Sequence, residues 1–132
     1  MKIRINKIFP LLILPLFFLT SFAQEEIPDK IITSLNTGDA KVLSGFFYQN
    51  VELVILENDN AYSKAQAQQI VSKFFSEYQT EKFTIIHDGG KEGAKFVIGN
   101  LLTNKGIFRV HFLLKVEKGK SYIHQLRIEK QS

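Results

Sequence analysis

Three histidines, His87, His111 and His124, are the side chains best suited to acid–base or metal chemistry. A neutral imidazole can exchange a proton near neutral pH, and it can also bind zinc. A zinc site built on His87 and His124 would need a third ligand, and no residue of the sequence suggests itself. The chain has no cysteine, which excludes a thiol nucleophile and a cysteine-based zinc site. We predict that it holds no metal and no cofactor.

An acid–base enzyme also needs a carboxylate whose pKa is raised by burial. The sequence suggests other roles for the aspartates: Asp39 as a helix cap, Asp59 in a turn and Asp88 in a glycine-rich loop. Glu52 could face inward, although a solvated strand position suits it better. The last three predicted strands place no acidic residue convincingly on their apolar face. We therefore predict no catalytic residue.

The first 23 residues have the three-part pattern of a secretory signal peptide. Three basic residues precede the apolar run Ile8–Leu19, and Ser21-Phe22-Ala23 supplies small residues for cleavage. The run is shorter than the roughly 18 residues of a membrane-spanning helix, which disfavours the alternative of an uncleaved anchor. We predict cleavage before Gln24, a single domain over residues 24–132, export to the periplasm or beyond, and no stable membrane anchor afterwards.

The basic balance of the chain comes mostly from this leader. The whole sequence has 17 Lys and Arg against 13 Asp and Glu, a net charge of +4. Lys2, Arg4 and Lys7 leave with the leader, so the mature chain would carry 14 basic against 13 acidic residues. Nucleic-acid binding needs a clustered basic surface, so we predict no nucleic-acid partner.

The chain after the leader begins with two predicted helices and a strand. Apolar residues from Ile27 to Leu35 recur on one helical face, and Gly38 suits the left-handed residue after a helix. Asp39 can cap a shorter second helix, with Val42, Leu43, Phe46 and Phe47 facing inward. Residues 51–56 are predicted to form a strand and residues 57–60 a turn.

A longer amphipathic helix follows. Ser63 and Gln66 have the spacing of a capping box, in which each side chain bonds to the other residue's backbone N–H. One apolar stripe recurs at helical spacing after this box, which predicts a helix packed on an apolar surface. The stripe comprises Ala67, Ile70, Val71, Phe74, Phe75 and Tyr78.

Four strands complete the chain, near residues 81–88, 94–103, 106–117 and 121–130. Their short, glycine-containing connections predict antiparallel neighbours. Alternation is clearest in the third of them, with one apolar and one mostly polar face, as in a sheet covered on one side. The apolar set is Phe108, Val110, Phe112, Leu114 and Val116.

Register arguments then place the candidate polar residues. A three-residue turn would set Glu117 opposite Ser121 and Leu114 opposite His124, which puts His124 on the covered face. The same logic puts Asn100 on that face together with Phe96, Ile98 and Leu102. An alternative with Val97 and Leu101 inward is nearly as good. His111 lies on the open face, beside cations.

The sequence resembles the DUF4783 family of secreted bacterial proteins within the nuclear-transport-factor-2-like (SnoaL-like, cystatin-like) superfamily. The residues that carry the resemblance are Asn36–Ala40, Phe46-Phe47, Phe74-Phe75, Phe83, His87-Asp88-Gly89, Ile98-Gly99, Thr103–Gly106 and Phe108-Arg109-Val110. The resemblance implies an α+β fold, in which a curved antiparallel sheet wraps N-terminal helices into a cone. The expected order is helix, helix, strand, helix and four strands. It implies no activity.

Six residues are candidates for lining a pocket in the cone: His124, His87, Asn100, Tyr48, Tyr78 and Tyr122. A structural histidine with satisfied hydrogen bonds is the alternative for each imidazole. Our first hypothesis is an exported non-catalytic domain that binds a small apolar ligand or an envelope protein. The alternatives are a homodimer or envelope assembly subunit that uses the open sheet face, and a small-molecule isomerase or hydrolase that uses a cone-lining histidine.

Overall fold

A computed structural model describes residues 27–131, which form three helices and six strands. In chain order these are α1 (Asp29–Thr37), α2 (Ala40–Ser44), β1 (Phe47–Ile55), β2 (Asn58–Ser63), α3 (Lys64–Glu77), β3 (Thr80–Lys91), β4 (Ala94–Thr103), β5 (Gly106–Glu117) and β6 (Lys120–Lys130). The predicted signal peptide lies outside the described residues. Within residues 27–131, no helix has the length and apolar character needed to cross a membrane.

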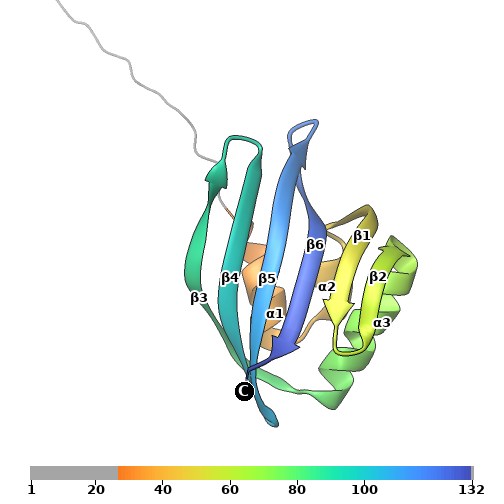
Figure 1. The fold of residues 1–132 in the computed structure, drawn as a ribbon, viewed down its shortest axis with the longest axis vertical. Helices are drawn as coiled ribbons and strands as arrows, with labels where there is room; N and C mark the ends of the chain where they lie inside the picture. Colours follow the sequence, from red (N-terminus) through yellow and green to blue (C-terminus); the bar gives the residue numbers. More distant parts are fainter. Residues whose placement is uncertain (1–26, 132) are drawn as a thin grey trace, which may run out of the picture.

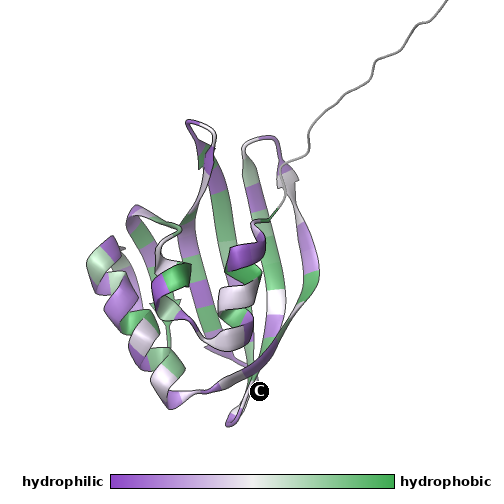
Figure 2. Cartoon of the chain, turned by 180° about the vertical axis from the view of Figure 1, so that it is seen from behind, coloured by the Kyte–Doolittle hydropathy of each residue, from purple (hydrophilic) through white to green (hydrophobic). Residues whose placement is uncertain are grey.

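The six strands form one curved, unclosed sheet in the order β2-β1-β6-β5-β4-β3 (Figure 1). Neighbouring strands are antiparallel, except that β1 and β6 run parallel. The three helices lie on one side of the sheet, as the view from behind in Figure 2 shows. We call this side the covered face and the other side the open face. The predicted α+β class and the curved sheet with its helices are confirmed.

One strand of this sheet is not predicted from the sequence. In place of the expected turn over residues 57–60, a two-residue turn, Leu56-Glu57, leads into β2. β2 pairs antiparallel with β1, and Ile55 lies opposite Asn58. Because β2 is an edge strand that is exposed along nearly its whole length, it carries no apolar alternation. Hydrophobic periodicity therefore cannot detect it.

The turn between the first two helices has the predicted conformation. Gly38 follows the last residue of α1, and its φ of 73° is left-handed, a conformation that glycine adopts without strain. Asp39 then accepts a hydrogen bond of 3.0 Å from the Val42 N–H and caps α2. The predicted inward orientation of Val42 is wrong, because its side chain is 37% exposed while Leu43 is fully buried. The short helix α2 instead buries Leu43 and Ser44.

Asn36 joins the end of α1 to β3. Its side-chain oxygen accepts a hydrogen bond of 2.8 Å from the Phe83 N–H. Its backbone carbonyl accepts another, of 3.0 Å, from the Thr80 hydroxyl. The segment Asn36–Ala40 therefore has a structural explanation: it ends one helix, begins the next, and fixes both against the sheet.

α3 begins with the predicted capping box. The Gln66 N–H donates to Ser63 Oγ at 3.2 Å, and the Ser63 N–H donates to Gln66 Oε1 at the same distance. The predicted stripe faces the sheet: Ala67, Val71, Phe74 and Phe75 are buried, and Ile70 and Tyr78 pack partly buried against the core. This arrangement places all six side chains of the stripe toward the core, four of them buried.

β4 directs toward the covered face the opposite set of side chains from the one that we predicted first. Val97 and Leu101 are fully buried, while Phe96 and Leu102 are 38% and 40% exposed. Asn100 therefore lies on the open face, and the alternative register is correct. The reason is at Gly99, where a Cβ atom would lie only 2.5 Å from Cζ of the buried Phe83 ring. The glycine makes room for this ring and fixes which face of β4 is covered.

The β5–β6 pairing agrees with prediction along most of its length but differs near the turn. Phe112 lies opposite Leu126, and Val110 opposite Ile128, as predicted. The turn itself has two residues rather than three, so that Glu117 lies opposite Lys120.

A β-bulge at His124 reconciles the shorter turn with the predicted pairs. Leu114 lies opposite Ile123, and Leu113 lies opposite Gln125, so His124 is the additional residue. Ile123 is fully buried on the covered face. His124 and Gln125 both lie on the open face, and the predicted covered position of His124 is wrong. Strict alternation cannot predict such a shift.

Candidate functional site

Apolar side chains fill the space between the helices and the covered face of the sheet. Phe47, Phe74, Phe108 and Phe112 are each at most 2% exposed. Of the six pocket candidates, only Tyr78 contacts this interior. Its ring lies 5.0 Å from the Phe74 ring and 4.9 Å from the Phe108 ring. Tyr78 therefore packs within an aromatic core at the end of α3.

His87 and Asn100 lie apart from one another and from this interior. A register shift after Ile85 exposes His87 on β3, where its ring lies 5.6 Å from that of Phe96. The side-chain oxygen of Asn100 accepts a hydrogen bond of 3.1 Å from Nε of Arg109 on the open face. Neither residue lines the cone, as the alternative of an enzyme with a cone-lining histidine would require.

The other three candidates, Tyr48, Tyr122 and His124, come together on the open face. The rings of Tyr48 and His124 stack 4.3 Å apart with an interplanar angle of 21°. Tyr122 meets the Tyr48 ring edge-on at 5.7 Å. Sequence reasoning selected these side chains but placed them on the wrong side of the sheet.

A hollow of about 400 Å³ opens beside this cluster, over β1, β6 and β5. It arises where β1 loses its pairing with β6 between Phe47 and Glu52, next to the bulge at His124. Its lining includes Tyr48, Glu52, Leu113, Lys115 and Gln125. Only the spatial pairing of the first and last strands reveals this hollow, and the sequence carries no local signal for it.

The surroundings of His124 favour its neutral form by lowering its pKa. Burial is the main cause that lowers its pKa from 6.5, and Lys115 lowers it further, while Glu117 opposes them. Its Nε2 atom is buried without a hydrogen-bond partner in the described structure. The closest carboxylate oxygen, Glu117 Oε2, is 3.7 Å away, too far for a hydrogen bond. Among the described residues, no carboxylate therefore forms a hydrogen bond with His124 Nε2.

His111 lies on the open face between Arg109 and Arg127, as predicted. Burial lowers its pKa most; Glu129 raises it, and the two arginines lower it. Arg127 Nη1 donates to Glu129 Oε2 at 3.0 Å. Among residues 27–131, no group of three or more histidine or acidic side chains is arranged to hold a metal ion.

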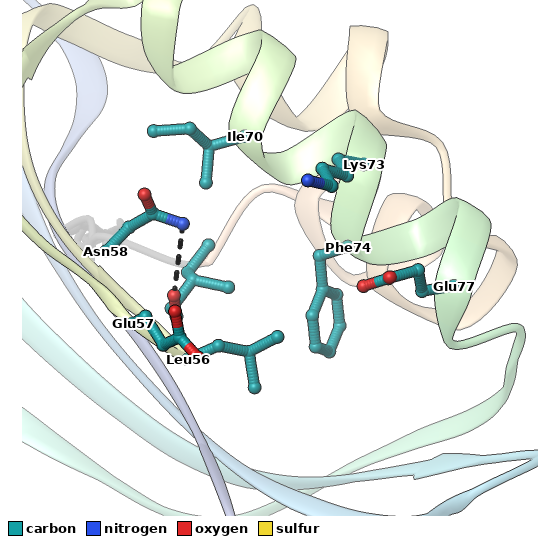
Figure 3. A pocket seen from close by; sticks show the side chains of 8 residues that line it. Leu56, Glu57, Asn58, Ile70, Lys73, Phe74 and Glu77 are labelled. Atoms are coloured by element: carbon teal, nitrogen blue, oxygen red, sulfur yellow. Dashed lines mark hydrogen bonds between the residues drawn. The ribbon is translucent and has the colours of Figure 1, made fainter.

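A second hollow, of about 240 Å³, lies between the β1–β2 turn and α3 (Figure 3). Ile55, Ile70 and Phe74 supply apolar walls. Lys73 projects from α3, and Leu56 from the turn. Sequence analysis missed this hollow because it missed β2. The one clue to this hollow in the sequence is Leu56, an apolar residue directly before the polar residues 57–60.

Comparison with known proteins places the chain in a family. The model of the domain of unknown function DUF4783 matches residues 28–129. A DUF4783 protein structure from Bacteroides ovatus ATCC 8483 is 33% identical, with a TM-score of 0.77 over 83% of this chain and 99% of that one. One from Bacteroides uniformis ATCC 8492 is 30% identical, with a TM-score of 0.76 over 81% and 99%.

A more distant structure shares the fold alone. An NTF2-like protein of unknown function from Cytophaga hutchinsonii ATCC 33406 is 14% identical, with a TM-score of 0.54 over 77% of this chain and 84% of that one. No curated protein sequence matches the chain. The expected resemblance is thus confirmed: the chain belongs to the DUF4783 family and has the nuclear-transport-factor-2-like fold.

Proposed function

We propose that this protein is an exported, non-catalytic interaction domain whose open sheet face pairs with a second copy of the chain. The observation that carries the proposal is a pair of exposed apolar side chains, Leu102 and Ile107, at one end of the open face of β4 and β5. They are 40% and 43% exposed and lie directly opposite one another. Large apolar side chains that share one exposed surface favour a protein interface.

The charges of the same face favour a second copy as the partner. Arg109 and Arg127 share the face with Glu129. A two-fold contact presents the same surface from both partners, so a face with both signs can match opposite charges across the interface. A face with charges of only one sign would repel the same face of a second copy.

The packing on the covered face supports a non-catalytic role. Aromatic side chains occupy the region in which a small apolar ligand or a substrate of an isomerase would have to bind. The histidines proposed for catalysis lie on separate strands of the open face, without a hydrogen-bonded carboxylate. We therefore rank the interaction domain above a ligand-binding cone and above an enzyme.

Native mass spectrometry of the exported protein tests this proposal. We expect twice the mass of a chain that begins at Gln24, with its dimer fraction rising as protein concentration rises. A chain that remains monomeric at every accessible concentration would contradict the dimer. A retained Met1 would contradict cleavage of the signal peptide.

A further inference from the structure

The hollow beside the Tyr48–His124 stack lies where two irregularities of the sheet meet. β1 departs from β6 between Phe47 and Glu52, and β6 contributes the additional residue His124. Each irregularity gives up regular ladder hydrogen bonds, and bulges often redirect side chains beside binding sites. Two such breaks at one place keep open a concave surface that regular pairing would close.

The lining of this hollow combines apolar and polar side chains, with one charge of each sign on opposite sides. Val51 is fully buried at its base, Leu113 is half-buried, and Tyr48 forms one wall. Lys115 projects from β5 and Glu52 from β1, with β6 between the two strands. One cation and one anion therefore face the same space.

Both charged groups can bind a ligand. Gln125 Nε2 donates to Glu52 Oε1 at 2.8 Å, which fixes this carboxylate and leaves its other oxygen available. Lys115 forms no salt bridge with any residue of the described chain. Because the charges of the lining cancel, the hollow favours a molecule that carries both signs over a simple anion or cation.

We propose that this hollow binds a small zwitterion with an apolar body, of the class of α-amino acids with apolar side chains. Lys115 binds the carboxylate, Glu52 binds the ammonium group, and the apolar body packs on Tyr48 and Leu113. The hollow lies toward the opposite end of β5 from Leu102 and Ile107, the apolar pair of the proposed dimer, so the site does not depend on the dimer.

His124 reports on occupancy of the site. Lys115 on β5 lowers the pKa of His124, and Glu117 on the same strand raises it. Tyr48 and Glu52 on β1 and Tyr122 on β6 are the other titratable groups around it. A ligand carboxylate on Lys115 offsets the positive charge, so the pKa of His124 should rise on binding. By linkage, the ligand should then bind more tightly as pH falls through this titration.

NMR titration of the mature protein with L-phenylalanine tests the proposal. We expect saturable shifts at the His124 imidazole and at the Tyr48 and Gln125 amides, with a higher pKa for His124. The matched probes 3-phenylpropanoate, which lacks the ammonium group, and phenethylamine, which lacks the carboxylate, should each bind about tenfold more weakly or worse.

Variants separate the site from general surface effects. Lys115→Met and Glu52→Gln should each weaken phenylalanine binding about tenfold, while the exposed Lys91→Met should leave it unchanged. Leu102→Lys should also bind phenylalanine normally, even if it abolishes the dimer. The proposal fails if the shifts do not saturate, if either analogue binds as tightly as phenylalanine, or if folded Lys115→Met and Glu52→Gln keep full affinity.

Discussion

Asn36 shows how one side chain can join two layers of the molecule. It accepts the Phe83 N–H at 2.8 Å, so an alanine would leave this part-buried donor without its partner. Asn36→Ala should therefore lower the free energy of unfolding by about 1–3 kcal/mol, measured by urea denaturation. Asn58→Ala is the control, because the Asn58 side chain makes only a 3.4 Å contact with Ile55 O. Equal losses in both variants would contradict this role for Asn36.

His124 predicts a pH dependence of stability. Burial and Lys115 hold its pKa in the folded protein below the unfolded value of 6.5. Between these two values the unfolded chain binds more protons, so stability rises with pH and is lost as pH falls below 6.5. Urea denaturation at a series of pH values should show this slope, and His124→Phe should reduce it. His111, whose pKa is also lowered, should retain its own share of the slope. An unchanged slope in His124→Phe would refute the assignment.

Among the elements, α3 is the one whose beginning can be tested most simply. Ser63→Ala removes the hydroxyl that accepts from the Gln66 N–H, and should destabilise the protein by about 1 kcal/mol. Thermal unfolding checks the effect against Ser72→Ala, an exposed position inside the same helix where alanine is the better helix former. If Ser72→Ala destabilises as much as Ser63→Ala, the loss does not come from the cap.

The strands show which elements a sequence can predict. β5 alternates between clearly apolar and mostly polar residues, and its faces were predicted correctly. β4 has apolar residues in both alternating sets, so its faces depend on Gly99 and the distant Phe83 ring. β2 is a polar edge strand and gives no periodic signal. The bulge at His124 shifts the alternation of β6 by one residue, and this places two site candidates, Tyr122 and His124, on the face opposite to the predicted one.

At the scale of the whole molecule, the parallel pairing of β1 with β6 decides where the open-face hollow forms. This contact joins the first and last strands, so no local pattern predicts it. The family resemblance did predict the overall fold, because the order and spacing of many residues carry that information. Function is less constrained, since related folds support many unrelated roles.

Sedimentation velocity of two lysine variants tests the central claim, that the open sheet face pairs with a second copy, most directly. Leu102 and Val42 are 40% and 37% exposed, but Leu102 lies on the open face and Val42 on α2. The account predicts a concentration-dependent dimer for the unaltered chain and for Val42→Lys, and a monomer for Leu102→Lys. A dimer that persists in Leu102→Lys, or one that is lost equally in Val42→Lys, would contradict it.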